Sequence, residues 1–403
     1  MRISPYRFIW VWMAAATAIV LVSSCSGPSS VDGDAVVVNA PTPADDATDQ
    51  SLSVVLFWLV NGATQNVTGY DVYFGATPDP PLVAEDHQEL FYNVPNALVV
   101  STEYYWRVVA KEASGKDHPG ELWRFQTRDG VWTRMLSNTS QFLSSVWAVS
   151  LNDAFAVGNG GTIRRFDGTT WTGMTSGSAL NLNDVWALDG DNAVAVGNSG
   201  TILLYDGFTW TRVGLQLPNA HLWGVWGAAG NAIFVVGDNG TVRYFDGTAW
   251  GDMPSTTSAN MTSICGTSDS NVFAVGAAGT VIHYNGTVWS TMPSGTGANL
   301  ADVWCAGPND VFAVGANGSI IHYDGNSWAP MVTNTTEFIY SIWGSSSSDV
   351  FAVGNIGTTL RFDGVQWYPM DSGFGGLLGG IDGLSRSDVF STGDNGAILR
   401  YGP

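Results

Sequence analysis

Carboxylates are the side chains of this sequence with the clearest capacity for chemistry. From residue 131 onward there are nineteen Asp, eight Arg, one Glu and no Lys. Asp184 and Asp302 occupy one position of a repeated segment that holds Ser or Gly in the other copies. Glycoside hydrolysis needs two carboxyl groups whose surroundings give them different pKa values. Glu337, Asp184 and Asp302 are therefore the carboxylates available to a glycan-directed hydrolase or lyase.

Metal and thiol chemistry have weaker support. Cys265 and Cys305 lie in neighbouring copies of the repeat, so they are either a disulfide in an oxidising compartment or two buried thiols. His283 and His322 share one repeat position, and two ligands without a third make an incomplete zinc site. We therefore expect neither a bound metal nor a cofactor, and we assign no residue a catalytic role.

Composition excludes several classes of protein. The 403 residues include 49 Gly and 18 Trp, and only 12% are charged, which argues against a disordered chain, a helical bundle and a coiled coil. Lys and Arg total 15 against 35 Asp and Glu, a net charge of -20. Because this charge repels phosphate backbones, we expect no nucleic-acid partner.

A repeat of 39 or 40 residues organises the chain from residue 129 to the end. A V-G-x-x-G turn, T-G-x-x-G in the last copy, has its second glycine at Gly161, Gly200, Gly240, Gly279, Gly318, Gly357 and Gly396. Each copy contains four short apolar stretches, which predicts one four-stranded blade. The third stretch ends in an aromatic residue followed by Asp-Gly, or once Asn-Gly, and this exchange favours a turn role for the aspartates over a metal role.

The count of fourth strands predicts how the ring closes. The last copy stops at Pro403 without a D/N-G-x-x-W element, and an extra copy of that element stands at residues 129–135. We expect the strand from Val131 to Met135 to complete the last of seven blades by strand exchange, which removes exposed sheet edges. Asp184 and Asp302 would then line the central channel, as solvated walls or around a cation. The repeats resemble those of sialidase-like and photosystem-assembly-factor-like propellers, which implies a seven-bladed β-propeller over residues 129–403.

The N-terminus resembles that of a bacterial lipoprotein. Arg2 and Arg7 precede an uncharged run over residues 8–22, which is too short to span a bilayer. The run ends in V-S-S-C, and this segment, with its cysteine at Cys25, is similar to a lipobox. The resemblance implies a signal peptide over 1–24 and a diacylglycerol on Cys25 that anchors the protein in the cell envelope. Ser26 in place of Asp favours the outer membrane or cell surface. The alternative is an ordinary secretory signal.

Residues 25–39 are rich in Ser, Gly and Asp and are expected to form a flexible tether. Over residues 40–128, short alternating stretches predict a β-sandwich. EYYWRVVA, with Tyr104 as a tyrosine corner, and Trp58 as a core residue resemble a fibronectin type III domain. The resemblance implies a spacer that holds the larger domain away from the membrane, or an adhesion module.

The loops that lead into each blade vary most and carry aromatic residues outside the repeat pattern. The candidate binding residues are Phe142, His221, Trp223, Glu337, Phe338, Tyr340 and Phe374. Exposed aromatic rings beside amides and carboxylates suit sugar faces or peptide segments, and the alternative is that these rings pack under their own loops. The sequence therefore predicts an all-β, membrane-anchored lipoprotein that acts as a non-enzymatic platform for a protein or carbohydrate partner.

Overall fold

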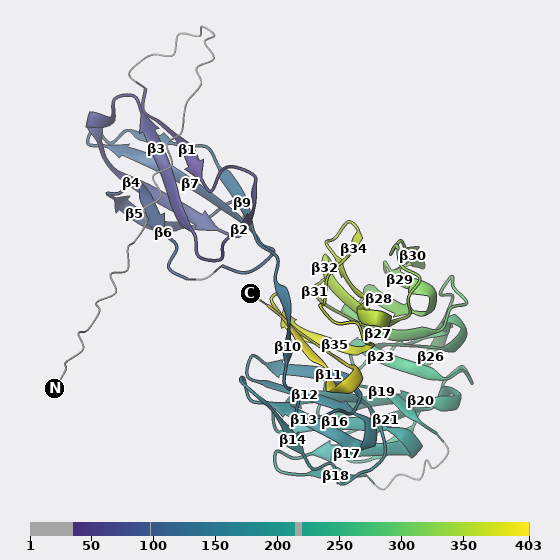
Figure 1. The fold of residues 1–403 in the computed structure, drawn as a ribbon. Helices are drawn as coiled ribbons and strands as arrows, with labels where there is room; N and C mark the ends of the chain where they lie inside the picture. Colours follow the sequence, from purple (N-terminus) through teal and green to yellow (C-terminus); the bar gives the residue numbers. More distant parts are fainter. Residues whose placement is uncertain (1–34, 97, 214–219, 403) are drawn as a thin grey trace, which may run out of the picture.

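The computed structural model describes residues 35–96, 98–213 and 220–402. Every regular element within these residues is a strand or a short 3₁₀ turn, so the chain is all-β. A small unit of two sheets joins a ring of sheets (Figure 1). In this part of the chain no helix has the length and apolar character that a membrane crossing requires. The expected signal sequence and Cys25 lie outside the described residues.

The smaller unit is a sandwich with one core. One sheet has the order β1–β3–β6 and the other the order β2–β9–β7–β4–β5, with β8 paired to β7. The elements are β1 (Val37–Thr42), β2 (Ala47–Gln50), β3 (Val55–Asn61), η1 (Thr64–Asn66), β4 (Val67–Gly75), β5 (Leu82–His87), β6 (Phe91–Asn93), β7 (Glu103–Glu112), β8 (Asp117–Pro119) and β9 (Trp123–Thr127). Trp58 and Trp106 join the core from opposite sheets, at most 1% exposed. The Tyr104 hydroxyl accepts the Val99 N–H at 3.1 Å. β1 begins upstream of the boundary expected at residue 40.

The larger unit contains seven four-stranded sheets among the described residues, and we number these blades 1 to 7 in chain order. The inner strands are β11 (Leu143–Ser150), β15 (Leu182–Asp189), β19 (Leu222–Ala229), β23 (Met261–Ser268), β27 (Leu300–Gly307), β31 (Ile339–Ser346) and β35 (Leu378–Ser385). The second strands are β12 (Asp153–Gly158), β16 (Asn192–Gly197), β20 (Ala232–Gly237), β24 (Asn271–Gly276), β28 (Asp310–Gly315), β32 (Asp349–Gly354) and β36 (Asp388–Gly393).

The outer half of each blade follows a 3₁₀ turn. The turns are η2 (Asn159–Gly161), η3 (Asn198–Gly200), η4 (Asp238–Gly240), η5 (Ala277–Gly279), η6 (Ala316–Gly318), η7 (Asn355–Gly357) and η8 (Asp394–Gly396). The third strands are β13 (Thr162–Phe166), β17 (Thr201–Tyr205), β21 (Val242–Phe245), β25 (Val281–Tyr284), β29 (Ile320–Tyr323), β33 (Thr359–Phe362) and β37 (Ile398–Gly402). The outermost strands are β14 (Trp171–Met174), β18 (Trp210–Arg212), β22 (Trp250–Asp252), β26 (Trp289–Met292), β30 (Trp328–Met331), β34 (Trp367–Pro369) and, in blade 7, β10 (Val131–Met135).

The inner strands contact one another around a closed circle, because β35 of blade 7 packs against both β31 and β11. In blade 7, β10 pairs antiparallel with β37, so Trp132 lies opposite Tyr401. The first strand of the ring is therefore the outer strand of its last blade. Apolar second strands fill the space between blades, and Phe155, Phe234 and Phe351 are fully or almost fully buried there.

The two glycines of the repeated turn are required by close backbone contacts. A Cβ on Gly158 would lie 2.0 Å from the carbonyl oxygen of Phe142, at the start of the same blade. Gly161 has φ 70°, and its Cβ would lie 1.9 Å from the oxygen of Ser178, in the loop that leads to blade 2. No side chain fits at either position, so this pair presses each turn against its own inner strand and against the approach to the next blade.

The repeated Asp-Gly segments form turns, as the sequence predicts. Gly168 has φ 91°, and Asp167 Oδ1 accepts the backbone N–H groups of Thr169 and Thr170 at 2.9 and 2.7 Å. These hydrogen bonds lower the pKa of Asp167. Asn285 accepts the equivalent two N–H groups in blade 4, so the turn needs an acceptor oxygen and no charge.

A buried arginine joins the sandwich to the ring. Arg361, on β33, is 2% exposed; its Nε donates to Asp349 Oδ1 at 2.7 Å and its Nη1 to Ser101 Oγ at 2.9 Å. Ser101 belongs to the sandwich, and Leu52 and Val100 of the same unit pack in one apolar cluster with Tyr401 of blade 7. The two units are therefore docked through a buried polar contact inside an apolar interface.

We expect Arg361→Gln to lower the free energy of unfolding by about 3 kcal/mol, because it removes the guanidinium closest to the buried Asp349 carboxylate and leaves Arg386, whose Nε lies 3.8 Å from Asp349 Oδ2. Arg165→Gln is the matched control, since Arg165 holds the same repeat position in blade 1 but its side chain is 30% exposed. A loss of at most about 1 kcal/mol is expected there. Denaturant titration of both variants measures the difference, and equal losses would contradict a special role for the interface.

Candidate functional site

A pocket of about 590 Å³ opens at the end of the ring where the inner strands begin. Four of the candidate binding residues line it: Phe142, Trp223, Phe338 and Tyr340. Phe142 and Phe338 directly precede β11 and β31, whereas Trp223 and Tyr340 are the second residues of β19 and β31. Closure of the ring brings these strand starts, from blades 1, 3 and 6, to one surface. We call this surface the mouth.

The aromatic rings of the mouth are held in fixed positions. Phe338 and Tyr340 stack with ring centroids 4.4 Å apart. The indole Nε1 of Trp223 donates to Asp238 Oδ1 at 2.8 Å, and the Trp223 residue remains 37% exposed. Rigid aromatic side chains of this kind supply contact area with little loss of conformational entropy on binding.

The other three candidate residues do not line the mouth. The His221 ring lies beside Trp223, with centroids 5.8 Å apart, and its Nδ1 accepts the Ser199 N–H at 3.3 Å. Phe374 packs against the cluster that joins the sandwich and blade 7, with the Arg134 guanidinium 5.6 Å from its centroid. Glu337 contributes its backbone oxygen, which accepts the Gly318 N–H at 2.8 Å. His221 thus packs beside Trp223. Phe374 packs in the interface between the sandwich and blade 7, and Glu337 takes part through its backbone.

Asparagines complete the mouth, and the sequence analysis did not select them. Asn181, Asn260 and Asn299 occupy one repeat position, directly before the inner strand, and all line the pocket. Their Oδ1 atoms accept the N–H groups of a 3₁₀-turn residue of the preceding blade, at 3.0, 2.9 and 2.8 Å. Because each oxygen is occupied, the Nδ2 group is the edge left to donate to a ligand. An alignment of the seven repeats would have shown that Asn recurs at the residue directly before the inner strand.

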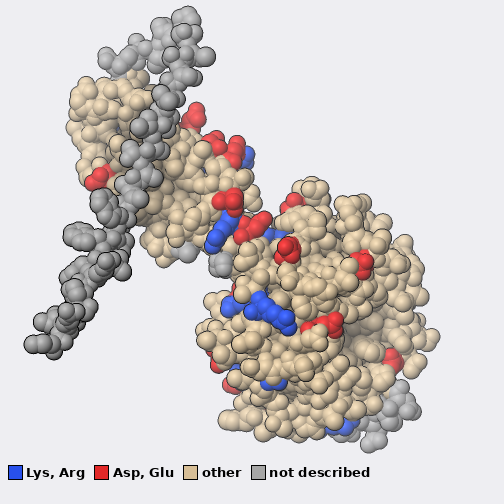
Figure 2. Space-filling view, viewed as in Figure 1, with Lys and Arg blue, Asp and Glu red and all other residues tan. Residues whose placement is uncertain are grey.

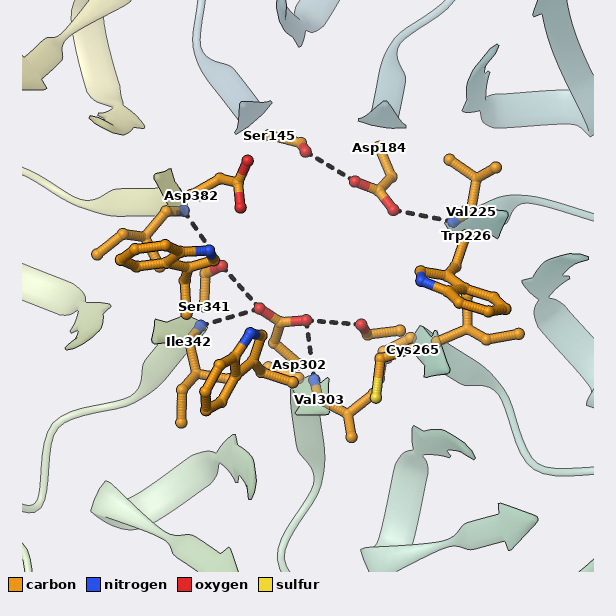
Figure 3. Close-up of a pocket in the computed structure, with 18 of the residues that line it drawn as sticks. Ser145, Asp184, Val225, Trp226, Cys265, Asp302, Val303, Ser341, Ile342 and Asp382 are labelled. Carbon is orange, nitrogen blue, oxygen red and sulfur yellow. Dashed lines mark hydrogen bonds between the residues drawn. The ribbon is translucent and has the colours of Figure 1, made fainter. Parts of the chain in front are cut away.

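Below the mouth the pocket continues into a channel cavity of about 270 Å³ that contains both predicted channel aspartates. Asp184 Oδ1 accepts a hydrogen bond from the Ser145 hydroxyl at 2.7 Å, and Oδ2 accepts one from the Val225 N–H at 2.8 Å. Asp184 therefore joins blade 2 to blades 1 and 3 (Figure 3).

Asp302 makes the equivalent connection across the channel. Its Oδ1 accepts Ser263 Oγ at 2.6 Å, and its Oδ2 accepts Ser341 Oγ at 2.7 Å and the Ile342 N–H at 2.9 Å. Blade 5 is thus joined to blades 4 and 6. Both aspartates therefore hold neighbouring blades together through their side chains.

A third channel carboxyl, Asp382 on β35, was missed. It is 8% exposed and lies at the position that holds Trp in blades 1, 2, 3, 5 and 6, and its Oδ2 accepts the Ala148 N–H at 2.6 Å. Burial raises the pKa of Asp382 to about 8 and that of Asp184 to about 7, and it raises the pKa of Asp302. Among the described residues, none that lines the channel is Lys, Arg or His.

The remaining chemical candidates have structural surroundings. A disulfide joins Cys265 to Cys305, so blades 4 and 5 are covalently linked beside the channel. His283 and His322 lie within hydrogen-bonding distance of Asn271 and Asp310 on the second strands of their own blades, both at 2.6 Å. Within residues 35–402, leaving aside the undescribed gaps, no three His, Cys, Asp or Glu side chains are grouped closely enough to hold a metal ion.

Comparison with known proteins identifies the architecture of the ring. YCF48 from Cyanidioschyzon merolae superimposes with a TM-score of 0.58 at 16% identity, over 68% of this chain and 99% of that chain. The ring is a β-propeller. YCF48 bound to D1 peptide gives 0.58 at 17%, over 68% and 97% of the two chains. The WD40 β-propeller domain of Doa1 gives 0.56 at 14%, over 67% and 96%. No family model and no curated protein matches the sequence.

The raised pKa of Asp382 predicts a pH-dependent stability difference between the wild type and Asp382→Asn. Between about pH 4 and pH 8 the unfolded chain ionises this carboxyl while the folded propeller keeps it protonated. Wild-type stability therefore falls with rising pH by up to about 1.4 kcal/mol per pH unit from this group, and the loss levels off above its folded pKa.

Asparagine carries no charge, so Asp382→Asn should gain stability relative to the wild type as pH rises from 5 to 9. Thermal unfolding at several pH values measures this difference, and Asp269→Asn, at an exposed residue, is the control. A difference that stays constant over this range would show that Asp382 titrates normally.

Proposed function

We propose that this protein is a lipid-anchored lipoprotein of the bacterial cell envelope and that its propeller recognises an extended segment of a partner protein at the mouth, without catalysis. The mouth carries this proposal, because it combines the exposed indole of Trp223, the stacked Phe338 and Tyr340 rings, and a row of amide groups with free N–H edges. Aromatic anchors beside oriented amides suit a main chain with apolar side chains.

The asparagine amides of the mouth can bind the main chain of a peptide. Three asparagines present Nδ2 groups from blades 2, 4 and 5, and these can donate to main-chain carbonyl oxygens of an extended segment. A structural neighbour with the same fold is YCF48 bound to D1 peptide, so a ring of this architecture can hold a peptide.

The other parts of the chain support presentation of that mouth. The sandwich has the two-sheet order and the Tyr104 hydroxyl contact that suit a fibronectin type III-like stalk. Pairing of β10 with β37 supports a ring closed by strand exchange, which leaves the stalk attached beside the closure. A lipid on Cys25 would place this stalk between the membrane and the propeller.

In the described residues the structure does not bring Glu337 together with the channel aspartates, as the glycan-directed hydrolase would require. Glu337 lines neither the mouth nor the channel, whereas Asp184 and Asp302 hold neighbouring strands together through hydrogen bonds. Recognition, not hydrolysis, is the function that this geometry supports.

Selection from a random peptide library against the full-length protein tests the proposal. We expect a common motif to emerge, and Trp223→Ala should weaken the selected peptides about 10-fold to 100-fold, because truncation of a central aromatic anchor costs roughly 2 kcal/mol. Phe208→Ala is the matched control, since Phe208 is 90% exposed on the outer edge of blade 2.

A glycan array probed with the same variants decides between ligand classes. Glycan binding that Trp223→Ala abolishes, together with failure of peptide selection, would overturn the peptide assignment. Glycan turnover that Glu337→Gln abolishes would overturn the non-enzymatic assignment.

The anchor is tested separately. We expect Cys25→Ser to move the protein from the membrane fraction to the soluble fraction and to abolish its labelling by an alkyne-tagged palmitate, because several acyl chains bind a bilayer far more strongly than one. Ser24→Ala keeps a small residue before the cysteine and should leave labelling intact. Membrane retention without label in Cys25→Ser would contradict lipid anchoring.

A further inference from the structure

The three carboxyls of the propeller channel differ in how many hydrogen bonds they accept. Asp302 accepts four and Asp184 accepts three, so their oxygens are largely occupied by the surrounding strands. Asp382 accepts one, at Oδ2. Its Oδ1 accepts no hydrogen bond of normal geometry from the described residues. A carboxyl more than nine-tenths buried thus directs a free oxygen toward the channel (Figure 3).

Aromatic rings border the space around this carboxyl. Trp343 of blade 6 and Trp147 of blade 1 hold the repeat position of Asp382 in the two adjacent blades, and both line the cavity together with Trp226 and Trp304. Indole faces attract cations through their quadrupole, most strongly where water is excluded. The channel therefore combines a carboxyl oxygen that accepts no hydrogen bond from the described residues with the indole rings of several tryptophans.

The channel holds three carboxyls, and among the described residues no Lys, Arg or His lines it. The carboxyls that face Asp382 are Asp184 on β15 and Asp302 on β27. The strands packed against β35, which are β31, β11 and β36, place no ionisable side chain in the cavity except Tyr340 at the mouth. A positive group entering this space would be stabilised by three carboxyls in a medium of low dielectric constant.

The channel and the mouth are one continuous space. Trp223, Tyr340, Ser144 and Asn183 line both. A segment bound across the mouth can therefore direct one long side chain downward between the inner strands. The cavity volume of about 270 Å³ leaves room for such a side chain.

We propose that the channel is a specificity pocket for a cationic side chain, lysine or arginine, of the segment bound at the mouth, with Asp382 as the direct partner of its ammonium or guanidinium group. This rests on the proposed function of the mouth and adds the chemical class of the residue that must be inserted. On the face drawn in Figure 2, acidic and basic residues are few and scattered, whereas the channel brings three carboxyls together.

Small probes test the pocket directly on the full-length protein. N-acetyl-lysine methylamide and N-acetyl-arginine methylamide are titrated by calorimetry, with the neutral N-acetyl-norleucine methylamide as the isosteric control. We expect the cationic probes to bind at least 10-fold more tightly than the norleucine probe. Their affinity should rise from pH 6 to pH 8.5, because a cation favours the ionised form of carboxyls whose pKa values burial has raised.

Two variants of Asp382 keep the test independent of folding defects. Asp382→Asn removes the charge, and Asp382→Trp restores the residue that most other blades carry and fills the space. Both should lose at least 10-fold in affinity for the cationic probes and lose the pH dependence, whereas Asp269→Asn should change neither. Equal binding of the norleucine probe, or unchanged binding by Asp382→Asn, would overturn the proposal.

The outcomes also separate this pocket from the function of the mouth. Selected peptides that lack Lys and Arg and bind Asp382→Trp at full affinity would overturn the specificity pocket and leave recognition at the mouth intact. Binding of the cationic probes without any selected peptide would overturn peptide recognition and leave the channel as a site for small cations.

Discussion

The structure depends on a close backbone contact that is made seven times. At each of the seven repeated turns, one glycine lies against the carbonyl that precedes its own inner strand, and at six of the turns a second glycine lies against the loop that leads to the next blade. The contact fixes the distance between successive inner strands because no Cβ fits in either gap. The same turns provide the N–H groups that orient Asn181, Asn260 and Asn299. A constraint on the backbone therefore determines the geometry of the binding surface.

Repetition explains why so much of this fold could be predicted. Residue types that recur every 39 or 40 positions predict the strand order, the Asp-Gly turns and the residues that line the channel, because equivalent positions in different copies have the same structural role. The repeat position alone predicts that Asp184 and Asp302 lie in the channel, and both line it in the structure. Their hydrogen bonds to neighbouring blades could not be predicted, because those partners are about 40 residues away in sequence and meet only through sheet packing.

The parts of the site that were missed depend on contacts that no single repeat contains. Asp382 replaces a tryptophan in one copy, and its significance appears only when ring closure places it between Trp343 and Trp147. The loop residues His221, Glu337 and Phe374 share the aromatic or charged character of true mouth residues. His221 directly precedes its inner strand, as Phe142 and Phe338 do, so repeat position and residue type together do not determine which side chain lines the mouth. Phe142 and Phe338 of the mouth come from loops, and Trp223 and Tyr340 come from strand starts, so the mouth draws on both kinds of position.

The sandwich affects the structure of the channel, in addition to its proposed role in holding the propeller away from the membrane. Leu52 and Val100 of the sandwich belong to the same buried cluster as Trp343 and Ile381, which are the ring neighbours of Asp382. Packed interiors transmit changes in volume because they contain few voids. Removal of the sandwich would expose Tyr401 and Arg361 and would leave one side of this cluster without its partner atoms. The position of the channel wall in blades 6 and 7 is therefore a property of the whole chain, so the propeller alone is an incomplete version of the binding site.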